Sequence, residues 1–198
     1  VFDNIAAEPI KDREIRRFDR IMAGVDWGFY PDPWAFNRIH YDAARRTLYI
    51  FCEFCRTRML NCDIAEEIKR LGFAKERIRA DCAEPKSNDD LRRLGISRIM
   101  PSVKGRDSIL NGIAAISEYR ITVHPDCVNM IRELSSYVYD DRVSENGKKM
   151  PKDSDNHLCD AMRYAFEDVK RFHPRREEKP IYRDTEIGGA DLNGGWDI

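Results

Sequence analysis

Apolar residues in the first third of the chain form three continuous or alternating runs. They lie at 21–26, 35–41 and 47–55, and runs of this length are typical of strands that are buried in a sheet. Only the polar stretch "DAARR" separates the second run from the third. Because so short a connection allows little more than a turn, we predict three strands that pair antiparallel with their neighbours in sequence.

The spacing of apolar residues becomes helical at Asn61. Ile64, Ile68 and Leu71 share one helix face, with Asn61 as the expected N-cap and Gly72 as the expected stop. Strands and helices are then predicted to alternate. They are, in order, strand 76–81, a helix with a Ser87–Asp90 capping box, strand 97–103, a helix carrying Ile109, Ile113 and Ile116, strand 120–124, helix 126–137 and helix 157–170.

This order of elements predicts an α/β fold. Its sheet is mixed, with three antiparallel strands followed by parallel strands, and helices cover both faces. Residues 1–20 are polar and lack periodicity, which indicates a linker or a peripheral arm, whereas 173–198 are charged and then Gly-rich, which indicates a C-terminal tail. Residues 21–172 are therefore predicted to form one domain. Within it, Asn146-Gly147 predicts an exposed hairpin with short polar arms.

The composition narrows the classes of function. The chain has 198 residues and a formal net charge of -1, so any contact with nucleic acid must come from a local patch of cations. No apolar run approaches the roughly 20 residues of a membrane span. The first 20 residues lack the charged-then-apolar layout of a signal peptide, so we expect no export. The sequence has no phosphate-binding G-x-x-x-x-G-K-[ST] loop.

The six cysteines are expected to be reduced thiols, because no export signal accompanies them. Cys52, Cys55 and Cys62 lie close together in sequence, and a C-x-x-C pair can hold zinc. Two further ligands at a suitable spacing are missing, however. We therefore interpret these residues as small apolar strand residues and keep a zinc-stabilised adaptor module as an alternative.

Two aspartates end predicted strands. Asp26 follows the apolar run "IMAGV" and Asp81 ends "ERIRAD". Ligands of open α/β sheets gather at the carboxyl ends of the strands, and adjacent parallel strands would place these carboxylates roughly 5 Å apart. Two acids at this distance repel each other unless a cation lies between them, and a hard divalent ion such as Mg²⁺ or Mn²⁺ is the expected cation.

The last predicted helix supplies further candidates in "DSDNHLCDAMRYA". His157 and Asp160 are three residues apart, so they share one face of the helix, away from the apolar stripe. Asp155 is more typical of an N-cap. Each acid also has an ordinary structural explanation, as a turn residue or as a favourable charge near a helix start. Three acids at three such ends together predict a metal site.

Four segments in order, "GVDWG", "ADCAEPKS", "PSVKGRDSILNGI" and "DNHLCDAMRYA", resemble the nuclease domain of tailed-phage terminase large subunits. The resemblance covers about residues 20–170 and is strongest to the branch of Gram-positive phages and defective prophages. It implies a ribonuclease-H-like fold and metal-dependent endonuclease cutting of concatemeric double-stranded DNA during genome packaging. It also implies that Asp26, Asp81 and Asp160 bind metal, with His157 beside them.

The resemblance implies partners as well. An ATPase motor would precede Val1 in the full-length protein, which would work with a terminase small subunit and a portal in the cytoplasm of the infected or lysogenic host. For phosphodiester hydrolysis we expect two Mg²⁺ or Mn²⁺ ions, which can activate water and stabilise the leaving oxygen. The carboxylates suit such ions, whereas the role of His157, metal ligand or water-positioning group, stays open.

Candidate phosphate contacts are local cations. They are Lys104 and Arg106, after the strand at 97–103, and Lys148 and Lys149 on the predicted hairpin. With a net charge of -1, we expect weak, salt-sensitive DNA binding with little sequence preference.

Two alternatives beside the zinc adaptor stay open. A junction resolvase or transposase-like nuclease would share the acids and differ in substrate. An actin or sugar-kinase-like phosphotransferase would also carry an aspartate after its first strand, although the bulky "WGFYPDPW" that follows Asp26 is unlike a phosphate-cradling turn.

Overall fold

The computed structural model describes residues 1–143 and 147–169. In this part of the chain, seven strands form one mixed sheet, and the antiparallel trio β2, β3 and β4 is flanked on each side by parallel strands. The predicted sheet type is thus confirmed. In sheet order the strands are β1 (Ile5–Ala7), β7 (Arg120–Val123), β4 (Thr47–Arg56), β3 (Trp34–Asp42), β2 (Ile21–Asp26), β5 (Ile78–Ala80) and β6 (Ile99–Pro101).

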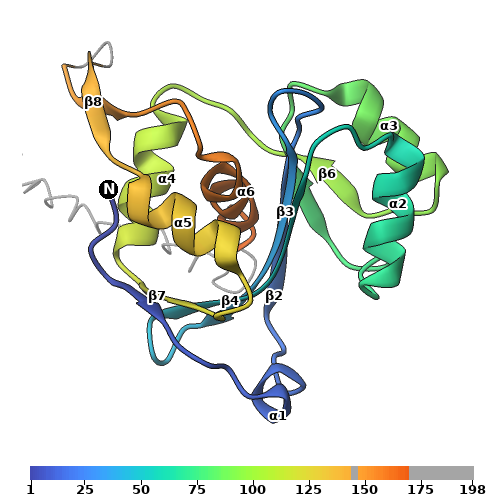
Figure 1. The fold of residues 1–198 in the computed structure, drawn as a ribbon, viewed down its shortest axis with the longest axis horizontal. Coiled ribbons are helices and arrows are strands. Elements are labelled where there is room, and N and C mark those ends of the chain that lie inside the picture. Colours follow the sequence, from blue (N-terminus) through green and yellow to red (C-terminus); the bar gives the residue numbers. More distant parts are fainter. Residues whose placement is uncertain (144–146, 170–198) are drawn as a thin grey trace, which may run out of the picture.

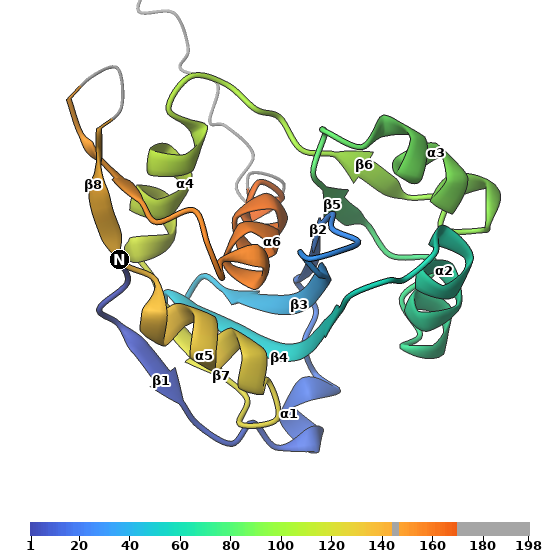
Figure 2. The same ribbon diagram turned by 45° about the horizontal axis from the view of Figure 1, so that its top comes forward.

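Helices cover both faces of the sheet, as predicted (Figures 1 and 2). One face carries α4 (Ser108–Ser117), α5 (Val128–Ser136) and α6 (His157–Phe166), and the other carries α2 (Asn61–Arg70) and α3 (Pro85–Arg93). Each face has its own cluster of buried apolar side chains. The molecule therefore has two hydrophobic cores that share the sheet as their common wall.

β2 is the strand on which both cores meet. Met22 packs into the core beneath α6, whereas Ala23 and Val25 pack into the core beneath α2 and α3, as the alternation of side chains along a strand requires. Gly24 faces α6 so closely that a Cβ atom at this position would lie 1.7 Å from the carbonyl oxygen of Ala161. The missing side chain is what allows the helix to lie directly on the strand.

Two predicted helix starts were wrong. α2 begins at Asn61 itself, and Leu60 is the N-cap, while the amide of Asn61 donates to the carboxylate of Asp90 (3.1 Å). α3 begins earlier than the predicted capping box, because Pro85 occupies its first turn and Ser87 lies inside the helix. In α2 a tertiary partner of Asn61 outweighs the local capping pattern, and in α3 the geometry of Pro85 does so.

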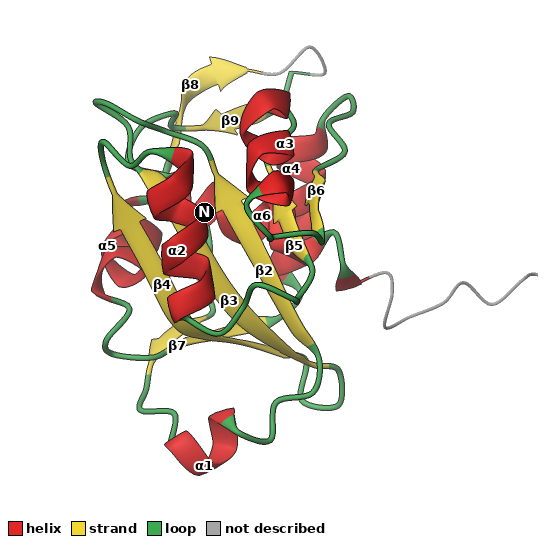
Figure 3. Cartoon of the chain, turned by 90° about the vertical axis from the view of Figure 1, so that its right-hand side faces the viewer, coloured by secondary structure: helices red, strands yellow, loops and turns green. Residues whose placement is uncertain are grey.

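Residues 1–20 are more than the predicted linker or peripheral arm. Ile5–Ala7 form the edge strand β1, which pairs in parallel with β7, and the ring of Phe2 is buried in the core beneath α6. A short helix, α1 (Asp12–Ile15), then leads to β2 and projects from one end of the sheet (Figure 3).

The predicted hairpin has the expected arms. β8 (Tyr139–Val143) pairs antiparallel with β9 (Lys149–Pro151), and the pair projects beside α4 (Figure 2). Asn146, the first residue of the predicted turn, lies outside the described residues, as does the predicted tail at 173–198. Among the described helices, none is both long and apolar enough to cross a membrane.

Candidate active site

The carboxyl ends of β2 and β5 bring two of the predicted acids together. The strands are parallel, with Val25 opposite Ala80, and the N–H of Asp81 donates to the carbonyl of Val25 (3.0 Å). Asp26 and Asp81 therefore come directly after two residues that are paired across neighbouring strands. The sequence-based prediction that they meet at this edge of the sheet is confirmed.

The first turn of α6 brings the other two predicted residues to the same edge. Nδ1 of His157 lies 3.0 Å from Oδ2 of Asp26. Asp160 follows on the same face of the helix, close enough that its charge affects the pKa of Asp26 and that the charge of Asp81 affects its own. All four candidate catalytic residues therefore gather where β2, β5 and α6 converge.

The carboxyls of Asp26 and Asp160 hold their protons more tightly than usual. Burial raises the pKa of Asp26, the hydrogen bond with His157 opposes that shift, and the charges of Asp160 and Asp81 add to it. Burial also raises the pKa of Asp160, although Arg163, whose Nη2 lies 3.0 Å from Oδ1, opposes the shift. Conversely, the hydrogen bond to Asp26 raises the pKa of His157.

Asp81 differs because a lysine contacts it directly. Nζ of Lys104 lies 2.6 Å from Oδ1 of Asp81, and the N–H of Ala83 donates to the same carboxylate (3.0 Å). Burial raises the pKa of Asp81, but Lys104 and Ala83 outweigh it, so the net shift is downward. Lys104, predicted as a phosphate contact, is here an ion-pair partner of a predicted metal ligand.

The donor set fits a divalent ion in its chemistry. In the part of the chain that the structure describes, no three His, Cys, Asp or Glu side chains are grouped tightly enough to hold a metal ion. Asp81 and Asp160 instead contact Lys104 and Arg163. Yet three carboxylates whose charges are coupled are the oxygen ligands that Mg²⁺ and Mn²⁺ prefer. A divalent ion would replace the basic neighbours as their counter-charge.

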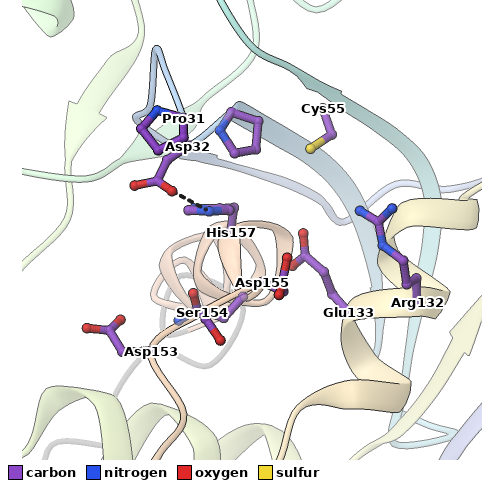
Figure 4. A pocket seen from close by; sticks show the side chains of 11 residues that line it. Pro31, Asp32, Cys55, Arg132, Glu133, Asp153, Ser154, Asp155 and His157 are labelled. Atoms are coloured by element: carbon purple, nitrogen blue, oxygen red, sulfur yellow. Dashed lines mark ion pairs between the residues drawn. The ribbon is translucent and has the colours of Figure 1, made fainter.

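A hollow of about 490 Å³ opens beside His157, between the loop after β2, the end of β4 and α5 (Figure 4). On its wall, Oδ1 of Asp32 lies 3.5 Å from Nε2 of His157, so the imidazole ring lies between two acids. Asp32 is not among the residues predicted from the sequence. An acid between two prolines, in the loop directly after Asp26, is the signal that could have found it.

Glu133 on α5 is a second residue of this region that was not predicted from the sequence. Its side chain is buried and accepts hydrogen bonds from the backbone at the start of α6. Burial raises its pKa to about 7, although those hydrogen bonds oppose the shift. The available signal was a glutamate on the apolar face of its helix, next to the buried Met130 and Leu134.

The other cations that we predicted as DNA contacts lie in the loop after β6 and on the hairpin. Arg106 is exposed in the loop between β6 and α4. Lys148 and Lys149 line a shallow hollow with residues of α4, including Leu110 and Asn111. The structure thus brings Lys104 to the acid cluster and places the two hairpin lysines over a neighbouring helix.

The cysteines give no support to a zinc site. Cys52, Cys55 and Cys62 are free thiols, and burial raises the pKa of Cys52 and that of Cys55, the latter to about 11. Zinc binds the thiolate, which these shifts disfavour.

The chain is similar to known terminase proteins. It is 37% identical over 200 residues to the terminase large subunit of Bacillus phage SPP1, a match that spans 98% of this chain and 43% of that protein. It is 30% identical over 169 residues to the PBSX phage terminase large subunit of Bacillus subtilis, covering 79% of this chain and 38% of that protein. The chain therefore spans less than half the length of these relatives.

Solved structures agree with this similarity. The large terminase nuclease domain of bacteriophage SPP1, solved with bound Mn, superimposes with a TM-score of 0.77 at 36% identity, over 85% of this chain and 98% of that one. The P22 large terminase nuclease domain, at 16% identity and a TM-score of 0.62 over 85% of this chain and 88% of that one, shares the fold. A family model described as "Terminase RNAseH like domain" matches residues 26–168, and the chain accordingly belongs to this terminase RNase H-like domain family.

Proposed function

We propose that the chain is the nuclease part of a terminase large subunit and cuts concatemeric double-stranded DNA during phage genome packaging. The observation that carries the proposal is the convergence of Asp26, Asp81, His157 and Asp160 at the carboxyl edge of one sheet. The SPP1 nuclease domain, solved with bound Mn, supports a divalent ion as the cofactor. Family membership argues against the phosphotransferase and zinc-adaptor alternatives.

Asp26, Asp81 and Asp160 would hold the metal, Mg²⁺ or Mn²⁺. Bound there, and most simply as two ions, it would supply the charge that makes water nucleophilic and the leaving oxygen tolerable. The role of the protein is to concentrate three negative charges at one point. Burial raises the pKa of Asp26 and of Asp160, and the charges of the neighbouring acids add to both shifts.

His157 is placed to handle a proton. In the neutral ring, with Nδ1–H donating to Asp26 (3.0 Å), Nε2 lies at the hollow as the proton acceptor, and once protonated it is placed to donate to Asp32, 3.5 Å away. From there it can orient a water molecule or take its proton. A role as a metal ligand would use the same nitrogen.

Double-stranded DNA is the proposed substrate, and its phosphates would be held by local cations. Lys104, Arg106, Lys148 and Lys149 are our candidates for these contacts. Contacts to phosphate carry no sequence information, which fits a domain that cuts with little sequence preference.

The longer protein would join this domain to an ATPase motor, and it would act with a terminase small subunit and a portal in the cytoplasm of the bacterial host. We propose residues 1–20 as the connection to the motor, with β1 and α1 included in it, and 173–198 as a C-terminal tail. The nuclease domain proper would be 21–172.

Cutting of supercoiled plasmid by the purified chain tests the proposed function. Reactions with Mn²⁺, Mg²⁺ or EDTA are compared for the natural sequence, Asp81→Asn and Asp126→Asn. Asp126 is a matched control because it also follows a parallel strand, β7, but its side chain is 92% exposed and it contacts none of the four site residues.

We expect cutting with either ion, none in EDTA, a loss of at least about 100-fold in Asp81→Asn, and natural activity in Asp126→Asn. Folded protein that does not cut with either ion would refute the nuclease. Cutting that survives Asp81→Asn would refute the acid cluster as its site. Much faster cutting of a four-way junction than of linear duplex would favour the junction-resolvase alternative.

A further inference from the structure

The helix that carries His157 and Asp160 lacks a cap from its own sequence. The side chain of Asn156, at the N-cap position of α6, makes no capping hydrogen bond. The first N–H groups of a helix have no partners within the helix, so they need acceptors from elsewhere. In α6 the acceptor is supplied by a different helix.

Glu133 of α5 is that acceptor. Its Oε2 accepts hydrogen bonds from the N–H of Leu158 (2.7 Å) and the N–H of Cys159 (3.1 Å). The side chain is 2% exposed, and Figure 4 shows it reaching from α5 toward the start of α6. A buried carboxylate at a helix start also interacts favourably with the helix dipole.

Asn37 of β3 holds the same turn from the other side. Its Nδ2 donates to the carbonyl of Leu158 (2.9 Å), and it is fully buried. Both polar groups of Leu158, the N–H and the carbonyl, are therefore fixed by buried side chains from two other elements. Leu158 lies between His157 and Asp160, so fixing its backbone fixes the direction of both side chains.

We propose that Glu133 and Asn37 are positioning residues that set the first turn of α6, so that His157 meets Asp26 and Asp160 faces the other acids. This inference rests on the proposed function, because it concerns the same site. Glu133 acts here through two hydrogen bonds that one of its oxygens accepts from backbone N–H groups. Asn37 acts through one hydrogen bond that it donates to a backbone carbonyl. Groups that orient metal ligands in this indirect way typically change metal affinity or activity 10- to 100-fold when they are removed.

The test compares Glu133→Ala, Glu133→Gln and Asn37→Leu with the natural protein in three measurements. They are Mn²⁺ affinity by calorimetry, plasmid cutting, and hydrogen exchange of the peptide spanning 157–162 in EDTA. Glutamine keeps an oxygen that can accept both N–H groups, whereas alanine keeps none. Leucine preserves much of the shape of Asn37 without its hydrogen-bond donor. If Glu133→Ala does not fold, the Asn37→Leu variant still tests the proposal.

We expect Glu133→Ala and Asn37→Leu to exchange faster at 157–162 and to lose about 10- to 100-fold in Mn²⁺ affinity or cutting. Glu133→Gln should stay within about 3-fold of the natural protein. The proposal is overturned if folded Glu133→Ala and Asn37→Leu keep natural exchange and Mn²⁺ affinity, or if Glu133→Gln is as impaired as Glu133→Ala, since the charge rather than the hydrogen bonds would then matter.

Failure of the proposed function gives a different result. The natural protein itself would then neither bind Mn²⁺ nor cut DNA. The exchange experiment in EDTA still decides whether Glu133 and Asn37 hold the helix start, because it needs no metal.

Discussion

At the scale of single residues, every acid of the site has a basic neighbour. His157 contacts Asp26, Lys104 contacts Asp81 and Arg163 contacts Asp160. These contacts neutralise a cluster that would otherwise repel itself. A divalent ion must therefore compete with side chains that already supply positive charge.

Lys104→Met tests this competition. Removing the ammonium that lies 2.6 Å from Asp81 removes a positive charge that repels an incoming ion, so we expect Mn²⁺ to bind several-fold more tightly in calorimetry without DNA. Lys152→Met, which removes an exposed cation, should leave the affinity unchanged. Weaker Mn²⁺ binding in Lys104→Met would contradict the idea of competition.

Glu133 gives the site a pH-dependent contribution to stability. Its pKa is raised from 4.5 to about 7, so between these values the folded protein binds more protons than the unfolded chain. The free energy of unfolding should therefore fall as pH rises from about 4.5 to about 7, by up to about 3 kcal/mol. Arg132 and His157 also influence this carboxyl.

Urea unfolding at pH 5 and pH 8 in EDTA measures this contribution. The difference between the two pH values should be smaller in Glu133→Gln than in the natural protein, because glutamine does not titrate. Equal differences in the two proteins would show that Glu133 has an ordinary pKa in the folded state.

Single residues also show what the sequence could and could not predict. The convergence of Asp26, Asp81, His157 and Asp160 was predictable because strand ends and helix faces follow from local periodicity. The position of Glu133 on the apolar face of α5 marks it as buried, but its partners are backbone groups of another helix, which no local pattern identifies.

At the scale of elements, the contact between β2 and α6 positions the site. Gly24 is the point of closest approach, since its missing Cβ leaves room for the backbone of Ala161. Periodicity predicted both bounds of β2 and the start of α6, whereas α6 ends at Phe166 and not at the predicted residue 170. It could not predict that β1 would join the sheet, because a strand of three residues carries little pattern and its pairing with β7 is decided by tertiary contacts.

Gly24→Ala should separate α6 from β2. A methyl group 1.7 Å from a carbonyl oxygen cannot be accommodated by rotating a side chain, so the helix backbone must move. We expect a loss of about 1 to 3 kcal/mol in the free energy of unfolding and a larger relative loss of cutting, because His157 and Asp160 move with the helix.

Gly105→Ala is the matched control for this change. An added Cβ there meets no atom within 4 Å, so urea unfolding and plasmid cutting should both stay natural. A Gly24→Ala variant with natural stability and activity would mean that α6 tolerates displacement.

At the scale of the whole molecule, the proposed DNA binding would rely on a few cations, because the net charge is only -1. We expect weak binding whose affinity falls steeply with salt. If Lys148 and Lys149 each contact a phosphate, the double alanine variant should lower the slope of log affinity against log salt by about 1.8. Fluorescence anisotropy with a duplex in EDTA, over a series of salt concentrations, measures the slope, and an unchanged slope would remove these lysines from the interface.

The two hydrophobic cores have a consequence for inactivation. Asp81 is held by a strand that packs into the core under α2 and α3, whereas His157 and Asp160 are held by a helix that packs into the opposite core. The site therefore depends on both cores, and loss of packing in either core would displace some of its residues. If the two cores lose their packing at different temperatures, cutting would stop at the lower of the two temperatures. The temperature at which activity is lost would then report the stability of the less stable core.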